Sequence, residues 1–301
     1  MNKRIIVSVF AILILSAIAL GIFSYTEKSN AKAKKENEEK LAEAIAARDI
    51  EQVKFLVSDK HTSFTANKDG FTPLDLAIMN QEYEIASILL EHGATISSQS
   101  DNPLFVNLIL SFGSPDDEKA YNEAYDMVLT ALKKHKDKLN DMNSRGNTAL
   151  HIAALRGLTG ITELLMKEGL DPGQPNNEGE TPAYIAAQEG HTEVITLLAE
   201  KNPDLLKVKD QRGNTMITAA VINMRVELLG LLVEKLPESL NEQNSEGKTA
   251  LMYASEYGEI DGVKLLLKAG ADSSLKDKEN KTAEALAKEW EHTEIVNLLN
   301  K

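Results

Sequence analysis

Along most of the chain, apolar residues recur at the spacing of short amphipathic helices, with polar turns between them. The pattern is most regular in the copies GNTALHIAA (from residue 146), GETPAYIAA (179), GNTMITAAV (213), GKTALMYAS (247) and NKTAEALAK (280), and GFTPLDLAI (70) belongs to the same series. Successive copies from residue 146 onward begin 33 or 34 residues apart. A steady period of this length predicts a solenoid of stacked helical repeats.

Each copy carries start and stop signals for two helices. A threonine stands where a helix N-cap belongs, and in two copies a proline follows at the first helical position, where proline is favoured. The first helix is rich in small residues and ends at a glycine, and the second carries a pair of leucines. The threonines are Thr148, Thr181, Thr215, Thr249 and Thr282, the prolines are Pro73 and Pro182, and the glycines are Gly157, Gly190 and Gly258.

These phrases resemble the ankyrin repeat, whose T-P-L-H-x-A-A, G-H and L-L-x-x-G-A-D signatures recur here at fixed offsets. The resemblance covers residues 39–301. It implies an all-α fold, an ankyrin-repeat solenoid of about eight stacked helix-turn-helix units with β-turn fingers. It also implies that His151 is scaffold, hydrogen-bonded within or between neighbouring repeats.

Two parts of the array depart from the pattern. Residues 41–56 have the two-helix pattern without the turn signature, as expected of an N-terminal cap. Residues 99–142 form a longer, degenerate repeat, with about ten residues more than the period requires. We expect the excess in the turn-rich, acidic stretch Ser111–Ala120.

The N-terminus has the features of a targeting segment. MNKR precedes nineteen uncharged residues, Ile5–Phe23, which is long enough for a membrane-spanning helix. Ala17-Ile18-Ala19 would also serve as a cleavage site, so residues 1–26 are interpreted as a signal peptide or an N-terminal membrane anchor. A buried core helix is a less favoured interpretation of the same segment. Residues 27–38, rich in lysine and glutamate, are interpreted as a charged linker or a helical stalk.

The charges around the apolar segment leave two orientations open. Lys3 and Arg4 favour export of the rest of the chain, to the periplasm or to the periplasmic side of the inner membrane. The lysines that follow the segment, Lys28, Lys32, Lys34, Lys35 and Lys40, favour the reverse, an array facing the cytoplasm.

Composition and charge narrow the functional classes. The formal net charge is −13 and basic blocks are lacking, so the sequence predicts no nucleic-acid partner and membrane contact only through the N-terminal segment. Cysteine is absent, which excludes disulfides and thiol chemistry. The motifs of serine hydrolases, zinc proteases, phosphate-binding loops and calcium loops are missing too, so we expect no enzyme, no cofactor and no metal.

Function is therefore expected on the surfaces that the repeat consensus leaves free, the fingers and the exposed face of the first helices. Charged residues there often form only a solvated surface, whereas Leu155, Ile222, Tyr257 and Trp290 are apolar at free positions of successive repeats. Trp290 could instead cover the end of the stack. The candidate partner-binding residues are Arg145, Asn147, Leu155, Arg156, Glu178, Gln188, Glu189, Arg212, Asn214, Ile222, Asn223, Glu256, Tyr257 and Trp290.

The sequence favours a monomeric, non-enzymatic protein of the cell envelope that binds one specific protein through its concave face. An acidic groove suits a basic partner, such as an exported enzyme, which the array would inhibit or protect against in the manner of an immunity protein. The alternative is a membrane-tethered scaffold facing the cytoplasm, or an effector that acts on host proteins.

Overall fold

The computed structural model describes residues 27–113 and 117–300. These residues are helices joined by turns, and their extended structure is limited to an isolated bridge between Lys209 and Thr215. Taken in order, the described helices fall into eight consecutive pairs, which confirms the helical repeat architecture. The candidate signal or anchor, residues 1–26, lies outside the described residues.

The chain divides into two compact bodies. The N-terminal body comprises residues 27–100 and 117–134 of the described chain, and the C-terminal body comprises 101–113 and 135–300. The repeat region expected over 39–301 thus contributes to both. The N-terminal body contains a helical segment at 27–46, then α2 (Ile50–Val57), α3 (Pro73–Met79), α4 (Tyr83–Glu91) and nearly all of α6 (Glu118–His135).

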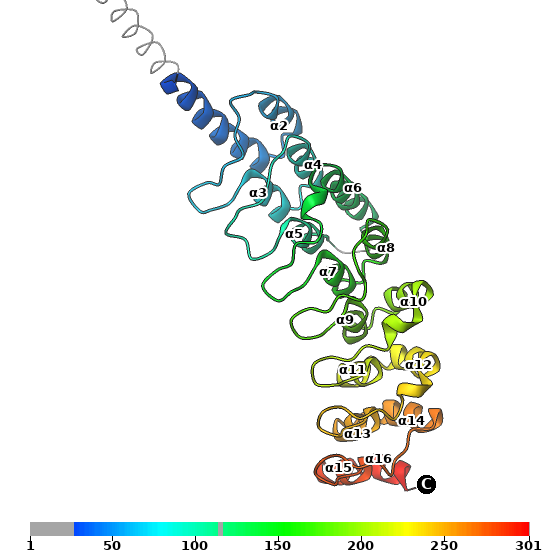
Figure 1. Cartoon of the computed structure of the whole chain (residues 1–301). Helices are drawn as coiled ribbons and strands as arrows, with labels where there is room; N and C mark the ends of the chain where they lie inside the picture. The colour runs from blue at the N-terminus through cyan, green and yellow to red at the C-terminus, as the bar shows by residue number, and fades with distance from the viewer. Residues whose placement is uncertain (1–26, 114–116, 301) are drawn as a thin grey trace, which may run out of the picture. The chain divides into compact units, whose positions relative to one another are not determined.

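The C-terminal body stacks its helices in two layers (Figure 1). The first helix of each pair contacts the first helix of the next, and the second helices lie behind this layer. The first helices are α5 (Leu104–Leu110), α7 (Ala149–Leu155), α9 (Pro182–Glu189), α11 (Met216–Ile222), α13 (Ala250–Glu256) and α15 (Ala283–Glu289). The others are η1 (Lys136–Lys138), α8 (Thr159–Lys167), α10 (Thr192–Lys201), η2 (Pro203–Leu206), α12 (Val226–Lys235), η3 (Pro237–Ser239), α14 (Ile260–Ala269) and α16 (Thr293–Leu299).

The predicted helix signals work as expected. The threonines of the repeat are the N-caps of the first helices, and Pro182 follows Thr181 at the first helical position. Gly190 ends α9 with φ of +84°, a left-handed conformation that glycine adopts at little cost. An added Cβ there would lie 2.9 Å from Arg225 Cδ, so glycine also allows the next repeat to approach closely.

Small residues set the spacing between first helices. Ala154, Ala186, Ala187 and Ala220 are fully buried and belong to one apolar cluster with the leucines of the second helices. Side chains of this size let neighbouring helices pack closely, and the continuous cluster holds successive repeats together.

The long third repeat differs from the expectation in where its extra residues lie. We predicted a loop over Ser111–Ala120, but α6 already begins at Glu118 and has 18 residues, whereas α4, α8, α10, α12 and α14 have 9 or 10. A buried apolar stripe of Ala124, Met127, Val128, Ala131 and Leu132 runs along α6 and explains why these residues are helical.

The charged segment at 27–38 lies within the helical residues 27–46, where pairs such as Lys40 and Glu36 at 2.8 Å join successive turns. Within the described residues, no helix combines the length and the apolar character needed to cross a bilayer.

Candidate functional site

The candidate site is the surface of the C-terminal body formed by its turns and first helices, here called the finger face. It comprises the five fingers 143–147, 176–180, 210–214, 244–248 and 277–281, together with α7, α9, α11, α13 and α15. The fingers are linked in a row by main-chain hydrogen bonds, such as Asn177 N–H to Arg145 O at 2.9 Å and Ser245 N–H to Arg212 O at 2.8 Å. The fingers therefore form a continuous row along one side of the first helices (Figure 1).

Asparagine side chains lock neighbouring fingers together. Asn176 Nδ2 donates to Asn147 Oδ1 at 2.9 Å, and Asn244 Nδ2 donates to Asn214 Oδ1 at 2.8 Å. Asn214 is only 4% exposed. Both side chains thus take part in the scaffold, and a role of Asn147 and Asn214 in binding a partner stays a prediction.

A second recurring contact joins the end of a finger to the end of its helix, eight residues later. Gln188 Nε2 donates to Glu180 Oε1 at 2.8 Å, and Lys248 pairs with Glu256 at 2.7 Å. Lys281 and Glu289 make the same contact at 2.7 Å. Gln188 and Glu256, which were expected to be free, are thus engaged within their own repeats.

Two more predicted binding residues are engaged inside the C-terminal body. The guanidinium of Arg156 donates to the main-chain oxygens of Leu110 at 2.9 Å and Phe112 at 2.6 Å, which satisfies carbonyls at the end of α5. Asn223 Nδ2 donates to Ala219 O at 2.9 Å. Both were interpreted as recognition residues from their position after the first helix, but the main chain uses their donors.

Charged residues at the tips of the fingers remain open to solvent. Arg145, Glu178 and Arg212 are exposed, and they occupy the same position in three successive fingers. Glu189 is exposed as well and lies 3.4 Å from Arg225 Nη2, an exposed pair that contributes little to stability.

Three of the four apolar candidates are exposed, as the sequence predicted. Leu155 is 37% exposed, Tyr257 48% and Trp290 58%, and Ile222 is half-buried. The ring of Tyr257 packs against that of Tyr253, with 5.9 Å between the two ring centroids. Large apolar side chains that protrude from a rigid surface are the usual energetic anchors of protein interfaces.

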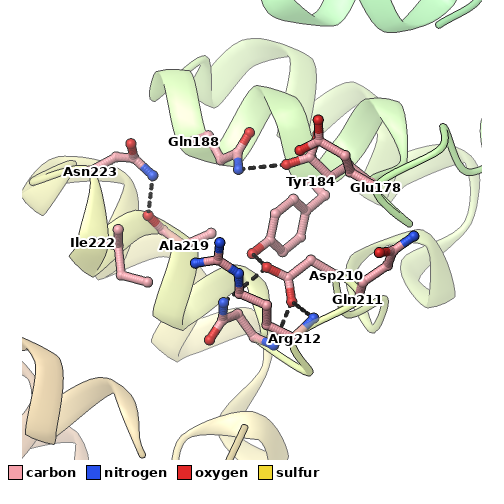
Figure 2. Close-up of a pocket in the computed structure, with 11 residues that line it drawn as sticks. Glu178, Tyr184, Gln188, Asp210, Gln211, Arg212, Ala219, Ile222 and Asn223 are labelled. Carbon is pink, nitrogen blue, oxygen red and sulfur yellow. Dashed lines mark hydrogen bonds between the residues drawn. The ribbon is translucent and has the colours of Figure 1, made fainter. Parts of the chain in front are cut away.

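One hollow of about 440 Å³ lies between the second and third of these fingers and is here called the Tyr184 hollow (Figure 2). Tyr184 points from α9 towards the next finger, where its hydroxyl donates to Asp210 Oδ2 at 3.0 Å. Burial and the neighbouring charge of Asp210 hold the pKa of Tyr184 well above its usual range, so it stays a donor. The hollow is lined by Glu178, Glu180, Tyr184, Gln188, Asp210, Gln211, Arg212, Asn214, Ala219, Ile222 and Asn223.

A second hollow of about 500 Å³ lies between the last two fingers and is here called the Trp290 hollow. Its walls include Leu286 and Trp290 and the ion pairs of Lys248 and Lys281. Burial disfavours the charged form of Lys248, but its hydrogen bond with Glu256 prevails and raises the pKa of Lys248. Lys248 also lies 5.2 Å from the ring centroid of Tyr253, close enough for a cation–π contact.

The hollows bring together only part of the predicted set. Glu178, Gln188, Arg212, Asn214, Ile222 and Asn223 line the first, and Glu256 and Trp290 line the second, whereas Arg145, Asn147, Leu155, Arg156, Glu189 and Tyr257 line neither. Sequence reasoning missed Tyr184 and Asp210 as members of a site. The spacing of eight residues between opposite charges in Lys248/Glu256 and Lys281/Glu289 marks side chains of the Trp290 hollow, but it does not point to Tyr184 or Asp210.

The finger face is built on a helical repeat scaffold, and the comparisons name the family of that scaffold. The family described as "Ankyrin repeats (3 copies)" matches residues 15–100, 118–208, 202–277 and 236–301. The chain belongs to the ankyrin repeat family. Ankyrin repeats are protein–protein interaction modules, which agrees with a surface of exposed apolar and charged side chains.

A relative with a similar sequence is an ankyrin repeat protein of Rickettsia bellii, 33% identical over 119 residues. The match covers 38% of this chain and 16% of the relative, so the chain spans a small fraction of the length of that protein.

Proposed function

We propose that the chain binds one protein partner in the cell envelope through the finger face and that this binding inhibits the partner or protects the cell from it. The observation that carries the proposal is the set of exposed apolar side chains Leu155, Tyr257 and Trp290 on the C-terminal body. Burial of such side chains between two proteins removes apolar surface from water and stabilises the complex.

The envelope location rests on the sequence of residues 1–26. Lys3 and Arg4 followed by the uncharged residues Ile5–Phe23 are typical of an export signal or an anchor. A chain delivered there without a catalytic motif would act by occupying a surface of another protein, as an inhibitor or an immunity protein does. We propose that it is not an enzyme.

The reverse topology is the second candidate. It is favoured by the lysines that follow the apolar segment, among them Lys32, Lys34 and Lys35, and it would make the chain a membrane-tethered scaffold or an effector in contact with cytoplasmic proteins. Alkaline phosphatase fused after Lys301 decides between the two, because it is active only outside the cytoplasm. An active fusion supports export, and an inactive but full-length fusion contradicts it.

The binding function is tested by affinity capture with the full-length chain, compared with its Tyr257→Ala and Trp290→Ala variants. Phe55→Ala serves as the matched control, because Phe55 is 70% exposed and belongs to α2 of the N-terminal body, which is not part of the finger face. A protein captured by the wild-type chain and the control but lost from both finger-face variants supports the proposal. Equal capture by all four chains contradicts it. The activity of the captured protein with and without the chain then tests inhibition.

A further inference from the structure

The two hollows on the finger face differ in how their carboxylates are neutralised. In the Trp290 hollow, lysines lie on the carboxylates: Lys248 pairs with Glu256 at 2.7 Å, and Lys281 pairs with Glu289 at 2.7 Å and Glu279 at 3.1 Å. Hydrogen bonds to these two glutamates raise the pKa of Lys281, so it stays charged. Glu246 and Asp277 in the same lining are in no ion pair among the described residues, so the Trp290 hollow is net negative too, but its Glu256 and Glu289 are each occupied by a lysine.

The Tyr184 hollow has three carboxylates and a single cation. The side-chain carboxylate of Glu180 accepts hydrogen bonds only from the neutral amides of Gln188 at 2.8 Å and Asn176 at 3.1 Å. None of the ion pairs among the described residues includes Glu178, Glu180 or Asp210. Arg212 is the one positively charged side chain in its lining. The hollow is therefore net negative.

The oxygens that remain free show where a cation would bind. Both oxygens of Asp210 are fully used, because Oδ1 accepts from the amides of Arg212 and Asn214, and Oδ2 accepts from Tyr184 Oη and Asn214 Nδ2. Each oxygen of Glu180 accepts a single bond, so one lone pair of each stays available. Glu178 is exposed beside it. A cation would thus contact Glu178 and Glu180. The negative charge of Asp210 in the same lining would attract the cation without contacting it.

The distance between the hollows sets the spacing of the partner's side chains. The Tyr184 hollow lies between α9 and α11, and the Trp290 hollow between α13 and α15, so two helix spacings of roughly 8–10 Å each separate them. An extended peptide advances about 3.3 Å per residue and crosses this distance in about five or six residues.

We propose that the finger face receives an extended segment of its protein partner, with an arginine in the Tyr184 hollow and a large apolar side chain against Tyr257 and Trp290 about five or six residues away. This inference rests on the proposed binding function and names the chemistry of the partner. Arginine fits better than lysine, because its planar guanidinium presents several donors at once to two neighbouring carboxylates. Exposed apolar rings at one end and unneutralised carboxylates at the other match such a segment.

The test uses the full-length chain and labelled synthetic peptides in which an arginine and a leucine are joined by Gly-Ser spacers of different lengths, in both orders. A matched peptide carries citrulline, which has the shape of arginine without its charge. Binding is measured by fluorescence anisotropy, and the emission of Trp290, the single Trp of the chain, reports whether the apolar end is occupied. We expect the arginine peptide with the five-residue spacer to bind about fivefold more tightly than its citrulline counterpart, the size of a single exposed charge contact.

Three variants make the test specific to the Tyr184 hollow. Glu178→Gln should abolish the preference for arginine, and Arg212→Gln should increase it, because the competing cation is removed. Glu246→Gln should change nothing, since Glu246 occupies the same finger position as Glu178 but lines the Trp290 hollow. Equal binding of arginine and citrulline peptides, or an equal loss in Glu178→Gln and Glu246→Gln, would overturn the inference. If the chain still captures a protein through Tyr257 and Trp290 in that case, the proposed function stands and only the arginine subsite fails.

Discussion

The Nε2 atom of His151 lies 3.2 Å from the main-chain oxygen of Glu180 and donates its proton to it, so one imidazole joins two successive repeats. The other nitrogen, Nδ1, accepts the hydroxyl of Thr148 at 2.8 Å. In the N-terminal body, Asp75 has the equivalent role, because its Oδ2 accepts from the amides of Thr72 and Ser97. The histidine is therefore a structural link in the array.

This link predicts a loss of stability in mild acid. Burial lowers the pKa of His151 from 6.5 to about 4, because the protonated ring would be buried and Nδ1 could no longer accept a hydrogen bond. Between these values the unfolded chain binds more protons than the folded chain, so stability falls as the pH falls through this window. The full loss is about 3 kcal/mol.

Urea denaturation of the wild-type chain and of His151→Gln between pH 7 and pH 4 measures this effect. The variant keeps a neutral side chain, so the difference in stability between the two proteins should shrink as the pH falls. A constant difference across the whole range would show that His151 does not titrate as described.

Two glycines with left-handed backbones separate conformational strain from close contact. An alanine at Gly270 would meet nothing within 4 Å and would only strain a φ of +97°, at a cost of about 1 kcal/mol. At Gly258, with φ of +75°, the added Cβ would also lie 2.7 Å from His292 Cε1, so Gly258→Ala should cost about 2–3 kcal/mol. Thermal unfolding of both variants checks this order, and equal losses would contradict the close packing between the last two repeats.

Removing a link between fingers should destabilise the array without any effect on its charge. Asn244 Oδ1 accepts from the amides of Glu246 and Lys248, and Asn244 Nδ2 donates to Asn214 Oδ1 and to the hydroxyl of Tyr253. Asn244→Ala should therefore cost about 2 kcal/mol, because it leaves several buried polar groups unpaired. The exposed Asn297 provides the control Asn297→Ala, and a shift in the urea midpoint that is no larger for Asn244→Ala would refute the interpretation.

The two arginines that sequence analysis placed together on the binding face should behave differently. Arg156→Ala removes donors to the main-chain oxygens of Leu110 and Phe112 and should destabilise the fold by about 1–2 kcal/mol. Arg145→Ala removes an exposed side chain and should change stability by no more than about 0.5 kcal/mol. Denaturation midpoints test the contrast, and a stability loss for Arg145→Ala as large as for Arg156→Ala would contradict these assignments.

The scaffold was predictable because each of its signals acts locally. Thr181, Pro182 and Gly190 fix the start and the end of α9 within a few residues, and the same phrase recurs at a constant period. The exposure of Leu155, Tyr257 and Trp290 could be predicted for the same reason, because the consensus leaves their positions without a core role. Their role in binding stays a prediction.

Polar residues at free positions could not be assigned in the same way. Whether Asn214 or Arg156 faces solvent depends on a partner in another repeat, Asn244 for the first and the carbonyls after α5 for the second. A donor side chain at a consensus-free position can bind either another molecule or its own neighbour, and the sequence contains both possibilities. The extra residues of the third repeat are a comparable case, because the apolar stripe from Ala124 to Leu132 makes them helix rather than loop.

The central claim is that the finger face contacts a protein partner, and site-specific photo-crosslinking tests it most directly. A photoreactive amino acid at position 257, 290 or 222 of the full-length chain in cells should yield one discrete crosslinked protein. The same group at position 55, which is exposed on α2, should not yield it. A partner that crosslinks from position 55 and from none of the three finger-face positions would contradict the account.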